Sequence, residues 1–133
     1  MVLYLVVLIA GLPPVHAWAL FLLSVVTILG IGSFGHLLND LFDLETDRIA
    51  GKKNRMAEFP HRQRWGILFL AILTALLPWI WLPSDRFSYC LLIAEFLLLA
   101  AYAIPPVRLK DRFGWVVAAD AAYAYALPSV LAA

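Results

Sequence analysis

Charged residues are scarce in this chain: Asp, Glu, Lys and Arg together make up 14% of its 133 residues. A soluble domain averages about 25% charged residues. Hydrophobic residues make up 64% of the chain, so the composition strongly favours a polytopic membrane protein over a soluble globular domain. We therefore expect a single transmembrane domain over residues 1–133.

The chain is also poor in cysteine, and its first residues do not have the pattern of a secretory signal. Cys90 is the single cysteine, which excludes an internal disulfide, and its apolar neighbours predict a small buried residue. Residues 1–12 are apolar, but they lack the basic start and the small-residue cleavage site of a secretory signal. The formal net charge of +1 by itself identifies no acidic or nucleic-acid partner, and we expect no nucleic acid.

Long apolar runs, in contrast, are abundant. A helix over residues 1–12 would be about 18 Å long, short of the hydrocarbon core of about 30 Å, and Pro13-Pro14 ends it. Four longer apolar segments follow, at residues 16–38, 65–82, 87–104 and 115–133. The fold class expected is all-α: a polytopic transmembrane helical bundle with a short first helix plus four spans. Short linkers predict that consecutive helices are antiparallel neighbours.

Two carboxylates lie inside predicted spans, where ionisable residues are candidates for function. Glu95 is near the middle of the fourth span, and it is either functional or a neutral group hydrogen-bonded between helices. Asp120 is about six residues inside the fifth span, beneath a basic loop. We expect Asp120 to contribute to substrate binding.

Basic residues gather in two loops. Six of the ten Lys and Arg residues lie between residues 48 and 64, three lie between 105 and 112, and Arg86 stands alone in the connection between those loops. The two rich loops are on the same side of the predicted membrane. By the positive-inside rule that side is cytoplasmic, in the inner membrane if the protein is bacterial.

An acidic stretch lies where the 16–38 segment runs out, just before the first basic loop. Asn39, Asp40, Asp43 and Asp47 fall within about a 100° arc of one helical face, whereas Glu45 points to the opposite side. Carboxylates this close repel one another unless a cation holds them together. This face has three interpretations: a solvated loop, an EF-hand-like calcium loop and a magnesium site for a phosphorylated ligand. The EF-hand pattern fails because Arg48 stands where Gly is needed and Asn54 where Glu is needed.

Magnesium fits better, because Mg²⁺ favours a few carboxylates together with substrate phosphates, and neighbouring Lys and Arg residues suit a diphosphate. The pattern Asn39-Asp40-x-x-Asp43-x-x-x-Asp47 resembles the first aspartate-rich motif of the UbiA-type intramembrane prenyltransferase family. The run from Tyr102 to Lys110, with Pro105-Pro106 at its centre, resembles the second cytoplasmic signature of that family, with Ala103 in place of the usual Ser.

The resemblance implies a helical bundle of about nine spans that transfers a prenyl group from an allylic diphosphate to a lipophilic, usually aromatic, acceptor within the membrane lipid. It implies Mg²⁺ as the cofactor, with Asn39, Asp43 and Asp47 as metal ligands. Asp43, Asp47 and Lys110 are the catalytic residues that it implies. Substrate binding is expected from Asn39, Asp40, Arg48, Tyr102, Arg108, Lys110 and Asp120.

The chain departs from the family in one respect. The resemblance implies a second aspartate-rich motif after the sixth helix, and this sequence ends in its fifth predicted helix. The alternatives are a fragment of a longer protein, a decayed copy, or one half of a split assembly that a second half-protein completes. A rival of another class is a non-catalytic membrane protein that at most binds lipid diphosphate.

Overall fold

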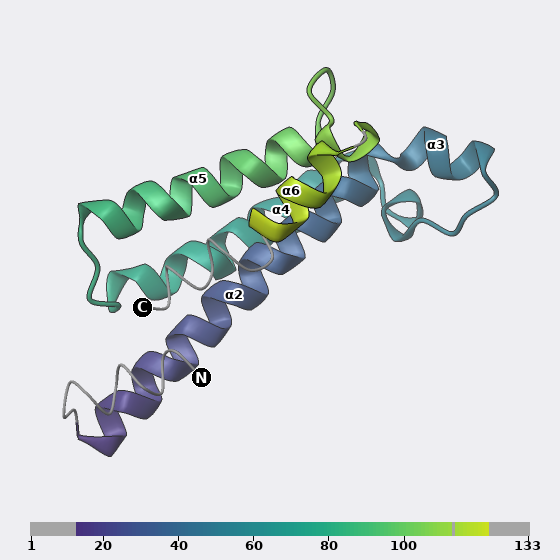
Figure 1. Ribbon diagram of the computed structural model, residues 1–133. Coiled ribbons are helices and arrows are strands. Elements are labelled where there is room, and N and C mark those ends of the chain that lie inside the picture. The colour runs from purple at the N-terminus through teal and green to yellow at the C-terminus, as the bar shows by residue number, and fades with distance from the viewer. Residues whose placement is uncertain (1–12, 113, 123–133) are drawn as a thin grey trace.

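Three long helices dominate the computed structural model, which describes residues 13–112 and 114–122 (Figure 1). They are α2 (Pro14–Phe42), α4 (His61–Leu76) and α5 (Arg86–Ala103). Each is long and apolar enough to cross a membrane, counted over Val15–Phe42, His61–Ile80 and Arg86–Ala103. The described residues contain no strand, so the prediction of an all-helical chain is confirmed, with three helices apolar enough to span a membrane. The predicted first helix at residues 1–12 lies outside the described residues.

Proline and capping residues define the helix ends. Pro14 occupies the first turn of α2, where its missing N–H is not needed. Pro60 is the N-cap residue of α4, directly before its first turn. The Asp85 carboxylate accepts a hydrogen bond of 2.8 Å from the Ser88 N–H and caps α5. Pro78 cannot donate to an α-helical ladder, and the segment from Leu77 to Ile80 tightens into the 3₁₀ helix η2. The predicted third span is therefore helical, with an α-helical part that ends at Leu76.

Polar segments join these helices. Residues 48–64, predicted to form a polar loop, are partly helical. The helix α3 (Leu44–Ile49) and the 3₁₀ helix η1 (Arg55–Glu58) occupy part of this segment, and α4 begins at His61. The second basic loop contains the 3₁₀ helix η3 (Leu109–Asp111). The predicted fifth span begins as α6 (Trp115–Ala121), and residues 123–133 lie outside the described residues.

Helix α2 is the common neighbour of α4 and α5. It packs antiparallel to α4, as expected of consecutive helices, whereas α5 contacts α2 more extensively than it contacts α4. Phe34 of α2 meets Phe96 of α5 with ring centroids 5.0 Å apart. Large apolar side chains on the outer faces are exposed, among them Trp18, Leu29, Leu70, Ile93 and Leu97, as expected where lipid covers a helix. Cys90 is also exposed, so the prediction that it is buried is wrong.

The bundle interior is apolar with one carboxylate in it. Its buried side chains include Ile31, Phe34, Leu38, Leu68, Ala71, Ala75, Leu92 and Leu99. Glu95 is fully buried on α5, and neither of its carboxylate oxygens has a hydrogen-bond partner among the described residues. The interhelical hydrogen bond considered for Glu95 is therefore not found within that part of the chain.

Gly30 permits the closest approach between α2 and α4. A Cβ atom at Gly30 would lie 2.4 Å from the Ala75 backbone nitrogen, whereas one at Gly32 would meet no atom of the described residues within 4 Å. We expect Gly30→Ala to lower the free energy of unfolding by about 1–3 kcal/mol, because α4 must move away from α2. Gly32→Ala is the matched control and should be neutral or stabilising, since Ala favours the helix. Denaturant titration in micelles measures both, and equal stability of the two variants would contradict this account of the contact.

Candidate functional site

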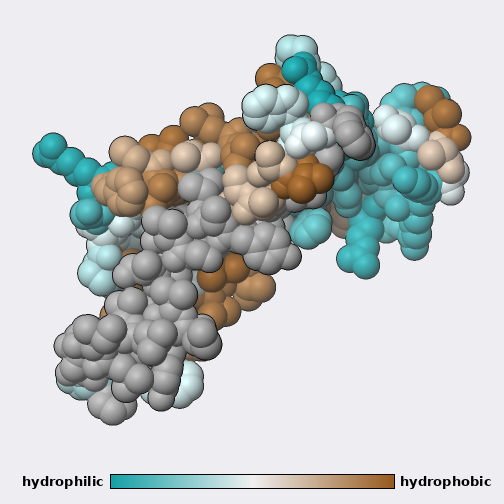
Figure 2. Space-filling view, in the orientation of Figure 1, coloured by the Kyte–Doolittle hydropathy of each residue, from teal (hydrophilic) through white to brown (hydrophobic). Residues whose placement is uncertain are grey.

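Hydrophilic residues gather at one end of the molecule, where α2 ends and α3, η1 and η3 meet (Figure 2). Helix α2 brings Asn39 and Asp40 to this end in its last turn, and Asp43 follows directly as the C-cap residue. Asp43 has φ −98° and ψ 1°, and there the helix breaks before α3 begins at Leu44. The predicted acidic face from Asn39 to Asp47 is therefore interrupted at Asp43 in its helical geometry, although the Asp47 N–H still donates to the Asp43 carbonyl at 2.7 Å.

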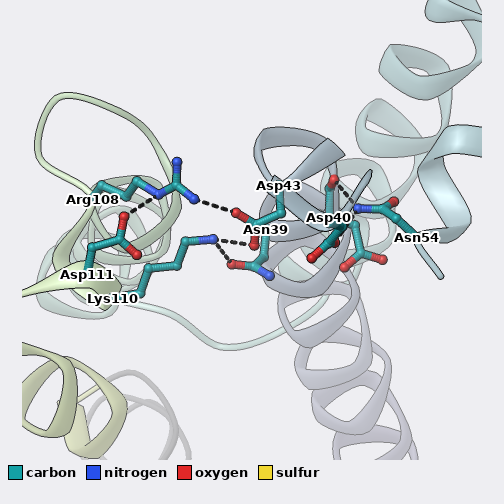
Figure 3. A network of polar contacts seen from close by, with 8 residues as sticks. Asn39, Asp40, Asp43, Asn54, Arg108, Lys110 and Asp111 are labelled. Carbon is teal, nitrogen blue, oxygen red and sulfur yellow. Dashed lines mark hydrogen bonds and ion pairs between the residues drawn. The ribbon is translucent and has the colours of Figure 1, made fainter. Parts of the chain in front are cut away.

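Asp43 forms an ion-pair cluster with the second basic loop (Figure 3). Arg108 Nη2 donates to Asp43 Oδ1 at 2.7 Å. Lys110 Nζ donates to the other carboxylate oxygen, Asp43 Oδ2, and to Asn39 Oδ1 at 2.7 Å. We call Asn39, Asp43, Arg108 and Lys110 the clamp cluster. These contacts join segments 65 to 71 residues apart in the sequence.

The backbone of Arg108 supports this arrangement at a cost. Arg108 has φ 38° and ψ 62°, the left-handed region that a residue with a Cβ adopts at a cost of about 1–3 kcal/mol. Its Nε lies 2.7 Å from Asp111 Oδ2, an ion pair rather than a well-aligned hydrogen bond. Two carboxylates thus hold the Arg108 guanidinium, and they offset the strained backbone beneath it.

Exposure separates the clamp cluster from the other ion pairs of this end. The side chains of Asp43, Arg108 and Lys110 are 14%, 23% and 12% exposed, whereas those of Arg48 and Glu45 are 76% and 68% exposed. The hydrogen bond from Arg48 lowers the pKa of Glu45. Water and salt screen such an exposed pair strongly, and they screen the clamp cluster less.

A second polar network lies beside the first and is centred on Asn54 (Figure 3). Asn54 Nδ2 donates to the Asp40 carbonyl and to Asp47 Oδ2, both at 2.8 Å. Its Oδ1 accepts a hydrogen bond of 2.9 Å from the Met56 N–H. Sequence reasoning missed this residue, because Asn54 stands between Lys53 and Arg55 in a polar loop and no periodicity marks it as buried.

The structure brings together only some of the predicted site residues. Asn39, Asp43, Arg108 and Lys110 meet directly, and Asp40 and Asp47 are linked through Asn54. Arg48 pairs with Glu45 and takes no part in the clamp cluster. Tyr102 is half-buried in the last turn of α5. Asp120 belongs to α6, and its side chain lies outside the described residues.

Two oxygens of the clamp cluster converge on one cationic atom. Asn39 Oδ1 and Asp43 Oδ2 both accept from Lys110 Nζ, so they form a position that a positive charge occupies. Such oxygen donors suit Mg²⁺, which takes one or two carboxylates and completes its shell with phosphates and water. Among the residues that the structure describes, no three His, Cys, Asp or Glu side chains are close enough to hold a metal ion. A ligand would have to supply the remaining donors.

No protein-family model, curated protein or solved structure matches this chain. Function is therefore inferred from the residues of the chain and from their arrangement. The strongest feature is the clamp cluster, since it joins both of the sequence motifs singled out above.

Removing Asp43 tests how firmly the clamp cluster holds the two segments together. Asp43→Ala leaves the largely buried Lys110 without its carboxylate and Arg108 with the exposed Asp111 alone among the described carboxylates, and we expect a loss of roughly 3 kcal/mol in the free energy of unfolding. Glu45→Ala is the matched control, because its ion pair is exposed, and it should change the stability little. Denaturant titrations in micelles compare the two variants. Equal losses would show that the cluster does not stabilise the fold.

Proposed function

We propose that this chain belongs to an integral membrane prenyltransferase of the UbiA type. The reaction proposed is Mg²⁺-dependent transfer of a prenyl group from an allylic diphosphate to a lipophilic, aromatic acceptor within the membrane. The observation that carries the proposal is the clamp cluster, in which Asp43 of the first motif meets Arg108 and Lys110 of the second. The proposed fold is a short first helix plus four spans, about half of a bundle of about nine helices.

The clamp cluster has the composition that a metal–diphosphate ligand needs. A diphosphate presents several anionic oxygens, which bind to guanidinium and ammonium groups by charge-assisted hydrogen bonds. Arg108 and Lys110 now donate to Asp43, so the ligand would take over these two donors while a cation takes their place at the carboxylate. The exchange keeps every charge paired, which matters for side chains that are 12% to 23% exposed.

Each residue then has a defined part in the reaction. Mg²⁺, when bound, would neutralise the leaving diphosphate as the allylic C–O bond breaks. Asn39 and Asp43 would hold the metal, together with Asp47 through the carboxylate oxygen that Asn54 does not bind. Arg108 and Lys110 would bind the departing phosphate oxygens, and the apolar interior would exclude water from the carbocation until the acceptor attacks.

The remaining predicted residues stand at the edge of this site. Asp40 is in the last turn of α2, beside Asn39, and Tyr102 is in the last turn of α5. In this proposal both contact the substrate, with Arg48 and Asp120 as further contributors. The second aspartate-rich motif expected from the resemblance would come from another segment or from a second half-protein.

Binding of an allylic diphosphate tests the proposal. The purified chain, in lipid nanodiscs, is mixed with radiolabelled geranyl, farnesyl or geranylgeranyl diphosphate at increasing Mg²⁺ concentration. We expect Mg²⁺-dependent binding of at least one of them, and a loss of roughly 10–100-fold in affinity for Asp43→Asn or Lys110→Gln. Glu58→Gln is the matched control, because Glu58 pairs with the exposed Lys53, 3.6 Å away, and with no other described residue, and it should bind like the wild type.

Two outcomes would count against the proposal in different ways. If none of the three diphosphates binds, the hypothesis that this chain is a prenyltransferase is excluded. Binding without release of diphosphate, when candidate acceptors are supplied, would favour the non-catalytic rival that only binds lipid diphosphate.

We further propose that α3, η1 and η3 face the cytoplasm. Nine of the ten Lys and Arg residues lie at residues 48–64 or 105–112, the two regions that these short helices overlap, and such residues favour the cytoplasmic side. Single cysteines at Glu58 and Ser84, in a chain with Cys90→Ser, report on the two sides. In a bacterial inner membrane, a membrane-impermeant maleimide should label Ser84→Cys in spheroplasts and Glu58→Cys only after lysis. The reverse pattern would overturn this orientation.

A further inference from the structure

Asn54 is a buried residue in a segment rich in exposed basic side chains. Its neighbours Lys52, Lys53 and Arg55 are exposed, whereas Asn54 itself is 7% exposed and Met56 is 1% exposed. Met56 belongs to the hydrophobic core cluster, so the loop is anchored into the bundle at this point. The buried amide must find partners there, because an unsatisfied buried polar group costs about 1–3 kcal/mol.

Asn54 uses both of its amide N–H donors and its carbonyl oxygen in hydrogen bonds to three different segments. Its Oδ1 accepts from the Met56 N–H and caps η1. The two donors of its amide reach the Asp40 carbonyl at the end of α2 and Asp47 Oδ2 in α3. A side-chain amide has two N–H donors and a carbonyl acceptor, so no other residue of this size makes all three contacts.

We propose that Asn54 is a positioning residue for Asp47, and this inference rests on the proposed function. Asn54 holds one carboxylate oxygen of Asp47 and links it to the end of α2. Asn39 and Asp43, two members of the clamp cluster, lie at the same helix end. The other oxygen, Oδ1, accepts no hydrogen bond from the described residues and stays available to a cation bridging to a diphosphate. Asn54 thus acts on the ligand through Asp47 and does not touch it.

The contribution of Asn54 to Mg²⁺ affinity can be measured. Groups that orient a metal-binding carboxylate typically contribute 10–100-fold to metal affinity. A neutral amide suits the task better than a charged group, since it orients the carboxylate without competing with the cation for its charge. The Asp43 carboxylate differs, because cationic side chains hold both of its oxygens.

Asn54→Ser separates positioning from loop folding. Serine is a good N-cap, so it can still accept from the Met56 N–H, but it is too short to reach both Asp40 and Asp47. In the nanodisc assay with radiolabelled allylic diphosphates, we expect the Mg²⁺ concentration for half-maximal binding to rise by about 10–100-fold. Hydrogen–deuterium exchange should show the Met56 amide still protected, whereas Asn54→Ala should expose it.

A double-mutant cycle with Asp47→Ala decides the mechanism. If Asn54 acts through Asp47, Asn54→Ser should add little to the loss that Asp47→Ala already causes. Additive losses, or unchanged Mg²⁺ dependence in Asn54→Ser while the wild type binds, would overturn the role of Asn54 and leave the proposed function standing. No binding by the wild type would overturn the proposed function and this inference together. Glu58→Gln again serves as the unaffected control.

Discussion

The ion pairs of Asp43 with Arg108 and Lys110 constrain the whole polar end of the molecule. They require α2 and α5 to end at the same level, although 65 residues separate Asp43 from Arg108. Helix α4 meets this requirement by returning the chain antiparallel along α2, so that α5 can run parallel to α2. The close approach at Gly30 and Ala75 keeps this geometry compact. The apolar bundle therefore determines where the charges of the clamp cluster meet.

Energetics explain why these charges lie at the bundle end rather than inside it. Burying an ion pair fully costs more in desolvation than its attraction returns, whereas an exposed pair contributes little. At intermediate exposure the clamp cluster keeps an appreciable attraction and remains accessible to a ligand. The left-handed Arg108 adds backbone strain, and its ion pairs with two carboxylates help to offset that strain. A polyanion that competes for Arg108 and Lys110 would find donors already desolvated and directed toward one point.

Much of this arrangement could be predicted from the sequence. Apolar run length and the flanking prolines predicted the three long helices, because both act locally on the backbone. The two aspartate and proline motifs were predicted to lie on the same side of the membrane, because both adjoin basic loops and because both resemble motifs of one family. The break at Asp43 and the burial of Asn54 could not be predicted, since they depend on contacts between distant segments that leave no periodic pattern. The same holds for the main contacts of α5, which are with α2 rather than with the preceding helix.

Asp43 and Asp47 of the first motif are held in physically different ways, and the difference bears on how a metal–diphosphate ligand would enter. Cationic side chains hold both oxygens of Asp43, and a ligand with its own cation can exchange with them. A neutral amide holds one oxygen of Asp47, and nothing in that contact needs to break when a cation arrives. Asp47 would then be set in advance, while Asp43 would become available only as Arg108 and Lys110 move to the phosphates. Binding of the metal and of the diphosphate would therefore be mutually dependent, because each releases the site that the other needs.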